Sequence, residues 1–240
     1  MIKVITSKTN PKIKYAISLK DNKMMKEHHQ FLGESKKSLM LAIKANLVSE
    51  VFTYEALDIS EEIKQYLVNE EVMKKLTNQK SVVEVCAICE KLNKKDVTDK
   101  ILILDNIQDP GNIGTLIRSA VSFNFNTIVM ESCADIYSSK VLRATQGAIF
   151  KLNIINAKID SFITSLNGYK IYGTSLKNGV GLKTIEKSSK LAIILGNEGN
   201  GVREEILDMT DKNIFIEITN MESLNVGVAG GIIMYELGGK

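Results

Sequence analysis

The sequence has no tryptophan and only two prolines, two histidines and three cysteines among its 240 residues. The cysteines, Cys86, Cys89 and Cys133, cannot all pair, and two of them share one strand-like stretch, so we expect no disulfide framework. The spacing of Cys86 and Cys89 matches half of a zinc site, but no second Cys or His pair has zinc-site spacing. We therefore predict no metal site.

Long hydrophobic runs are also missing. No apolar run approaches the roughly 18 residues that cross a bilayer. The opening segment, MIKVITSKTNPK, lacks the apolar core of a secretion signal. The chain is nevertheless 44% hydrophobic, as folded proteins are. We expect a cytoplasmic protein that does not bind membranes.

Positive charge is concentrated at one end of the chain. Residues 1–50 hold ten lysines and four acids, a net charge of +6, whereas residues 101–240 hold 13 basic and 14 acidic residues, a net charge of −1. A basic patch attracts polyanions through counterion release, which favours RNA as a partner. The alternative is a lysine-rich surface that only keeps the protein in solution.

Arginine is scarce: 28 of the 31 basic residues are lysine, and the arginines are Arg118, Arg143 and Arg203. Only the guanidinium offers a planar fork of donors that matches phosphate. These three positions are therefore candidates for work that lysine does poorly, with chance placement as the alternative.

The N-terminal part alternates helical and strand patterns. The predicted elements are a helix beginning at Asn10-Pro11, an apolar stretch at 30–33, a helix at 35–46, a strand at 47–54, a helix at 60–76 and a strand at 82–89. The charged segment that follows has no apolar periodicity. We therefore predict a first domain at 1–92, a linker at 93–100 and a second domain at 101–240.

The second domain has continuous apolar runs that are typical of buried parallel strands. They lie at 101–105, 127–130, 191–195 and 213–218, and helical stretches separate them. The fold class is therefore α/β. Polar and glycine-rich loops follow several of these strands, at the edge where open α/β sheets bind ligands.

Three such loops carry candidate chemistry. The first, DNIQDPGNIGTLIRSA, starts at Asp105 and leads into a helix beginning near Asn112. Turn and cap chemistry accounts for its Asp109, Pro110 and Gly111, and it accounts less well for Asn112 and Arg118. The second, GNEGNGV, carries Glu198 among glycines that allow close approach to the backbone.

The third loop, ITNMESLNVGVAGG, spans 218–231 and ends in a helix of small residues. Glycine is a poor helix former, so its use here predicts that a backbone or a ligand lies very close. Tight packing between helices is the alternative. The second loop, GNEGNGV, is neither a dinucleotide-binding nor a nucleoside triphosphate-binding motif.

In order and spacing, NIGTLIRSA, LGNEGNGV and MESLNVGVAGG resemble the three motifs of the SpoU (TrmH) RNA 2′-O-ribose methyltransferases of the SPOUT superfamily. The stretch SSKVLRATQGA, with Arg143 and Gly147, resembles the intermediate motif of that family. Residues 5–90 more weakly resemble the small ribosomal-protein-like substrate-binding domain of the rRNA-modifying members, through Ser7, Asn10, Lys14 and FLGES.

This resemblance implies a C-terminal parallel-sheet domain with a trefoil knot, a bound S-adenosylmethionine (AdoMet), a homodimer and an RNA substrate, most naturally 23S rRNA. It assigns several site residues. The implied catalytic residues are Asn112, Arg118, Glu198, Ser223 and Asn225. The implied cofactor contacts are Leu195, Gly196, Gly199, Ile218, Met221, Leu224 and Asn225. The implied RNA contacts are Lys8, Asn10, Lys12, Lys14, Arg118 and Arg143.

Members of the family are proposed to use the arginine at Arg118 as the base that removes the proton of the ribose hydroxyl. A guanidinium has a pKa above about 12 and keeps its proton in proteins. We instead predict that Arg118 holds a phosphate and stabilises the developing alkoxide, and that Glu198 and Asn225 orient it. Methyl transfer from a sulfonium needs no metal.

The sequence departs from the family at Asn220, Gly227 and Gly230, where proline, serine and alanine are usual; cofactor affinity is the property these changes affect. The adjacent His28 and His29 lie far from every motif, so we expect solvated or RNA-facing side chains. Two alternative functions stay open: the same reaction on tRNA, and a non-catalytic RNA-binding or ribosome-assembly factor.

Overall fold

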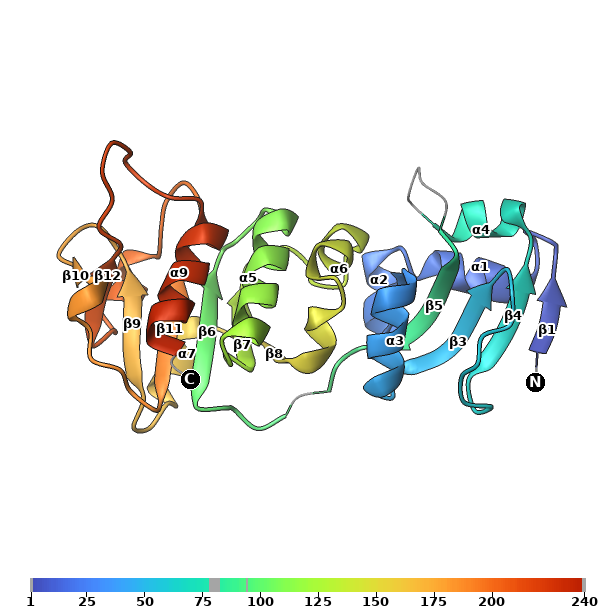
Figure 1. Cartoon of the computed structure of the whole chain (residues 1–240), viewed down its shortest axis with the longest axis horizontal. Coiled ribbons are helices and arrows are strands. Elements are labelled where there is room, and N and C mark those ends of the chain that lie inside the picture. Colours follow the sequence, from blue (N-terminus) through green and yellow to red (C-terminus); the bar gives the residue numbers. More distant parts are fainter. Residues whose placement is uncertain (1, 78–82, 94, 239–240) are drawn as a thin grey trace. The chain divides into compact units, whose positions relative to one another are not determined.

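A computed structural model describes residues 2–77, 83–93 and 95–238. By its internal contacts the chain forms two compact units, Met1–Leu92 with Tyr137–Phe150, and Asn93–Ile136 with Lys151–Lys240. Each unit contains one β-sheet with helices (Figure 1). The α/β class predicted from the apolar runs is confirmed.

The first unit has a five-stranded sheet whose order is β1-β4-β3-β5-β2. The strands are β1 (Ile2–Ile5), β2 (Gln30–Glu34), β3 (Val48–Thr53), β4 (Lys64–Val68) and β5 (Val85–Glu90). The helices are α1 (Pro11–Ser18), α2 (Asn22–Glu27), α3 (Lys36–Lys44), α4 (Glu70–Leu76) and α6 (Ser139–Thr145). Strands β1, β4 and β3 are parallel, and β5 pairs antiparallel with β3 and β2.

Most of the predicted N-terminal elements are confirmed. Helix α1 begins at Pro11 because the Asn10 side chain accepts a hydrogen bond from the Lys12 amide, at 2.9 Å. Helix α3 and strand β3 lie within the predicted ranges. Val82 of the predicted last strand and residue 94 of the predicted linker lie outside the described residues.

The helix predicted over 60–76 is wrong except over its last seven residues. Lys64–Val68 forms strand β4, which pairs with β1 on one side and β3 on the other, and only Glu70–Leu76 is helical. Gln65 of β4 is buried and exchanges two 3.0 Å hydrogen bonds with the Leu57 backbone. Sheet pairing between distant strands thus outweighs the local pattern.

The segment Tyr137–Phe150, which includes the intermediate motif, packs in the first unit. The Tyr137 hydroxyl accepts a hydrogen bond from the Leu92 amide at 2.9 Å, and Phe31 packs against both Tyr137 and Phe150. Gly147 has φ +82°, and a Cβ atom built there lies 2.7 Å from the Leu41 side chain. The motif glycine therefore has a packing role, while Arg143 is exposed on α6.

Gly147→Ala is expected to destabilise the first unit by about 1–3 kcal/mol, because it combines left-handed backbone strain with overpacking. Chemical denaturation measures the change. Adding Leu41→Ala removes the 2.7 Å contact, but it leaves the backbone strain and the 3.2 Å approach to the Ser38 backbone, so the double variant should recover part of the loss beyond additivity. Strictly additive losses would contradict the packing role.

The second unit contains a seven-stranded, wholly parallel sheet with the order β10-β12-β9-β11-β6-β7-β8. Its strands are β6 (Lys100–Asp105), β7 (Thr127–Glu131), β8 (Asn153–Asn156), β9 (Lys170–Thr174), β10 (Val180–Gly181), β11 (Leu191–Leu195) and β12 (Lys212–Phe215). Its α-helices are α5 (Pro110–Ser122), α7 (Ile159–Thr164), α8 (Glu204–Leu207) and α9 (Val226–Gly238). Figure 1 shows α5 and α9 side by side over the strands.

The parallel strands predicted at 101–105, 127–130 and 191–195 are confirmed. The strand predicted at 213–218 is partly wrong, because β12 ends at Phe215. The pairing with both neighbouring strands ends there too. The last residue of β12 that pairs with β9 is Ile214, and the last that pairs with β10 is Phe215. Residues from Ile216 onward therefore lie outside the sheet, and Ile218 begins the third loop instead of ending a strand.

Candidate active site

The first loop ends at the N-terminus of α5. The Asp109 carboxylate accepts a hydrogen bond from the Asn112 amide at 2.8 Å, and Pro110 takes the first helical position. The helix thus begins at Pro110, slightly before the start predicted near Asn112. Leu116 and Ile117 turn into the core, whereas Arg118 is exposed.

The second loop closes on itself directly after β11. The backbones of Asn197 and Gly201 exchange two hydrogen bonds, of 3.0 and 2.9 Å. A Cβ atom at Gly196 lies 2.1 Å from the Gly201 and Val202 backbones, so this position tolerates only glycine. The closed loop holds Glu198 at its exposed tip.

Gly196→Ala is expected to open this loop and to weaken AdoMet binding by about a hundredfold, since backbone cannot move aside as a flexible side chain can. Calorimetric titration with AdoMet measures the effect. Gly33→Ala, in β2 of the first unit, is the matched control, because the nearest atom to its added Cβ is the Cys89 Sγ atom at 3.6 Å. Equal affinities for the two variants would contradict the argument.

Three side chains from the three loops form one hydrogen-bonded chain. The Asn112 Nδ2 atom donates to Glu198 Oε1 at 2.9 Å, and Asn225 Nδ2 donates to Asn112 Oδ1 at 2.9 Å. Asn225 Oδ1 in turn accepts from the Gly227 amide at 2.9 Å, at the start of α9. Asn112 is the link, because its carboxamide carries both a donor group, Nδ2, and an acceptor, Oδ1.

The small residues of α9 serve helix packing. A Cβ atom at Gly230 lies 2.4 Å from Leu116 and 2.6 Å from Leu195, and one at Gly227 lies 3.1 Å from Thr115. Helix α9 therefore approaches α5 closely, which supports the alternative left open by the sequence. At Asn220, φ is +65°, a value outside the range of proline, so this chain folds the third loop differently from a proline-bearing one.

Arg118 stands outside the hydrogen-bonded chain. No described residue makes a hydrogen bond or ion pair with its guanidinium, and Glu198 and Asn225 bind Asn112 instead. The predicted orientation of Arg118 by these two residues is therefore not present in this structure. Ser223 is likewise exposed, in the third loop.

The residues implied in cofactor binding lie along the second and third loops and the adjoining strand end. Leu195 and Gly196 are buried, Ile218 and Leu224 are half-buried, and Gly199, Met221 and Asn225 are exposed. A Cβ atom at Gly201 meets nothing within 4 Å, so a ligand can reach the backbone there. These residues fit a cofactor held through backbone groups, as AdoMet would be.

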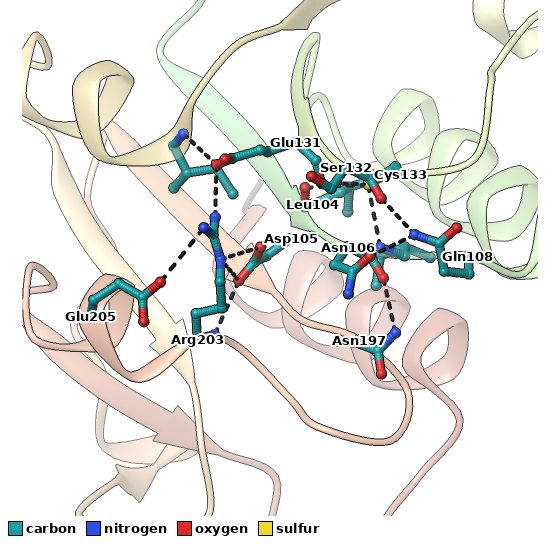
Figure 2. A network of polar contacts seen from close by, with 12 residues as sticks. Leu104, Asp105, Asn106, Gln108, Glu131, Ser132, Cys133, Asn197, Arg203 and Glu205 are labelled. Carbon is teal, nitrogen blue, oxygen red and sulfur yellow. Dashed lines mark hydrogen bonds and ion pairs between the residues drawn. The ribbon is translucent and has the colours of Figure 1, made fainter.

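The sequence did not predict the polar network that Arg203 forms with Asp105 and Glu131 below the second loop. It indicated only that Arg203 is one of three arginines. Arg203 Nε donates to Asp105 Oδ1 at 2.9 Å, and Arg203 Nη2 donates to Glu131 Oε2 at 2.7 Å (Figure 2). Asp105 is the last residue of β6, and its side chain is only 1% exposed. An aspartate at the end of an apolar strand could have indicated a buried carboxylate, and the few arginines of the chain could have indicated its partner.

The implied RNA contacts of the first unit are partly occupied by acids. Lys8 pairs with Glu71 at 2.9 Å, and Lys12 pairs with the buried Glu50 at 2.6 Å, which raises the pKa of Lys12. Asn10 caps α1, and Lys14 is exposed. His28 lies edge-on to Tyr15, with ring centroids 5.2 Å apart.

Among the described residues, no cluster of three or more His, Cys, Asp or Glu side chains is arranged to hold a metal ion.

Burial raises the pKa of Cys89 to about 12 and that of Cys133 to about 11, so both thiols are poor nucleophiles. Within the described part of the chain, no helix has the length and apolar character needed to cross a membrane.

Comparison with known proteins identifies the family. The family model of the SpoU rRNA Methylase family matches residues 99–235. This chain is a member of the SpoU rRNA methylase family. The match spans all three loops of the site, and it confirms the resemblance seen in their sequences.

Similar proteins cover both units. The 23S rRNA (guanosine(2553)-2′-O)-methyltransferase RlmP of Bacillus subtilis is 33% identical, over 99% of this chain and 100% of that protein. An AdoMet-bound rRNA methyltransferase from Sinorhizobium meliloti is 26% identical, with a TM-score of 0.89 over 98% of this chain and 97% of that one. A tRNA-modifying TrmH/SpoU enzyme of A. aeolicus, 28% identical, covers 60% of this chain and 76% of its own, with a TM-score of 0.53.

Proposed function

We propose that this chain transfers a methyl group from AdoMet to a ribose 2′-hydroxyl of 23S rRNA. The observation that carries the proposal is the hydrogen bonding of Asn112 to both Glu198 and Asn225. These bonds join all three loops in a member of the SpoU family. The matches along the whole chain to rRNA enzymes favour rRNA over tRNA. They support the predicted enzyme class and cofactor, and a cytoplasmic site of action.

The chemistry follows from what the side chains offer. Bound AdoMet supplies the electrophilic methyl group. The loop backbone at Gly196, Ile218 and Leu224 holds the cofactor, and Asn112 and Glu198 set the position of that backbone. Arg118, exposed and without a described partner, is available for a phosphate of the RNA and for the charge that develops on the ribose oxygen.

Two experiments test this function. Mapping 2′-O-methyl positions in total RNA, from cells with and without the chain, is expected to reveal one lost ribose mark in 23S rRNA. A lost mark in tRNA would instead support the tRNA alternative. Calorimetry with AdoMet is expected to show binding; none at millimolar cofactor would favour an RNA-binding protein without catalysis.

We also propose that two copies form a dimer through α9. Val228, Ile232 and Tyr235 lie on one face of this helix and are 50%, 39% and 69% exposed. Their spacing of four and three residues makes an apolar stripe directly after Asn225. A second copy that covers this stripe would place its own residues beside the site. The C-terminal trefoil knot and the RNA-binding role of the first domain, 1–92, are part of the same proposal.

Ile232→Glu is expected to convert the dimer into a monomer, because it places a charge within the apolar stripe. Sedimentation velocity measures the change. Met40→Glu is the matched control, since Met40 is an exposed apolar residue of the first unit, at 43% exposure. A monomeric wild-type protein, or an unchanged Ile232→Glu dimer, would contradict the proposed interface.

A further inference from the structure

Two carboxylates end neighbouring strands beneath the second loop. Asp105 is the last residue of β6 and Glu131 the last of β7, and the two are directly paired in the sheet register. Paired residues on adjacent strands extend to the same face, and like charges at such positions repel each other. A buried carboxylate such as Asp105 also needs a compensating charge.

Arg203 supplies that charge from a different part of the chain. Its backbone amide donates to Asp105 Oδ2 at 3.0 Å, and its Nε atom contacts both oxygens of that carboxylate at 2.9 and 3.1 Å. Its Nη2 atom reaches Glu131, whose Oε2 also accepts the Ile159 amide at 2.8 Å. A single ammonium group lacks the rigid fork needed to span both carboxylates, so lysine is a poor substitute.

The same strand end anchors the other side of the loop. Asn197 Nδ2 donates to the backbone oxygen of Asn106 at 2.9 Å, one residue beyond Asp105. Asn197 and Arg203 thus fasten both ends of the closed loop to two adjacent residues at the end of β6, Asn106 and Asp105, as Figure 2 shows. Glu198 lies between these two anchors.

We infer that Arg203 is a positioning residue for methyl transfer: by tying the second loop to Asp105 and Glu131, it holds Glu198 against Asn112 and the loop backbone at the cofactor. This inference rests on the proposed site. The Arg203 guanidinium is bound by Asp105 and Glu131, and among the described residues it makes no hydrogen bond or ion pair with Asn112, Glu198 or Asn225. Its removal should therefore loosen the loop while the sheet stays folded.

Arg203→Lys is expected to raise the dissociation constant of AdoMet about tenfold, the scale of one lost charge-assisted hydrogen bond. Amide hydrogen exchange gives a second readout. The Gly199 and Asn200 amides donate to Asn197 Oδ1 at 2.9 and 3.2 Å, and they should exchange faster in the variant. Amides of β6 and β11 should keep their wild-type rates.

Glu131→Gln is the milder variant, because it removes one charge and leaves the Asp105 pair intact; its effects should be smaller in the same direction. Lys170→Met is the matched control. It breaks an exposed ion pair with Asp211, 3.5 Å apart, in the same sheet but away from the loop. It should change neither the AdoMet affinity nor the exchange of the loop amides.

Faster exchange confined to the loop, together with weaker AdoMet binding, would support the inference. Two results would overturn it: unchanged loop exchange in Arg203→Lys, or faster exchange spread evenly over the whole sheet, which indicates only lost stability. If the wild-type protein fails to bind AdoMet, the proposed function fails, while the exchange rates still decide whether Arg203 holds the loop.

Discussion

Arg118→Ala is expected to lower the rate of methyl transfer by about a thousandfold, the usual cost of losing one donor that stabilises transition-state charge. The free energy of unfolding should stay unchanged, because the side chain is exposed and no described residue binds its guanidinium. Single-turnover transfer of labelled methyl to rRNA and the thermal midpoint measure the two effects. A large fall in the midpoint would mean that Arg118 is structural.

Arg118→Lys separates charge stabilisation from base catalysis. Lysine keeps a positive charge below its pKa, near 10.4, but loses the fork, so we expect a smaller loss than with alanine. Between pH 7 and pH 9 the rate of this variant should follow the wild-type profile. A rate that instead rises relative to the wild type between pH 7 and pH 9, as the lysine begins to lose its proton, would show that the residue at 118 acts as the base, and our interpretation of Arg118 would be wrong.

Asn112→Asp is expected to lower the transfer rate at pH 8 by at least about a hundredfold. The substitution replaces the donor at 2.9 Å from Glu198 with a second carboxylate, so one of the two pKa values must rise. Once that carboxyl is protonated, it again donates a hydrogen bond. The loss relative to wild type should therefore shrink as the pH falls from 8 to 6.

Asn112→Ala is the matched control for that pH dependence. It removes both hydrogen bonds of the Asn112 side chain without adding charge, so its loss should be the same at pH 6 and pH 8. Parallel pH profiles of AdoMet affinity and single-turnover rate for both variants decide the point. A pH-independent Asn112→Asp variant would show that Glu198 and residue 112 are not in contact during catalysis.

Local patterns predicted elements whose cause is local. The strand at 191–195 is a continuous apolar run, and α1 begins where Asn10 and Pro11 provide a cap and a fixed first residue. The helix predicted over 60–76 failed because β4 exists only through pairing with β1 and β3. Short edge strands such as β10 (Val180–Gly181) carry too few residues for any pattern.

The residues of the candidate site were also predicted only in part. The motifs named Asn112, Glu198 and Asn225, and the structure brings these three into contact. It does not bring Arg118 to them, because Arg118 lies further along α5 on its exposed side. Only the structure shows what α9 packs against. A glycine at 230 allows close approach of a ligand, a backbone or a side chain, and the structure places Leu116 and Leu195 there.

The sequence by itself determined the family, the buried parallel strands and the loops that carry the chemistry, because short motifs and apolar runs record these directly. Only the tertiary structure decided how the second loop is held. Arg203 meets Asp105 across 98 positions and Glu131 across 72. Such contacts arise when separate parallel strands end side by side in the sheet, and no local spacing encodes that neighbourhood.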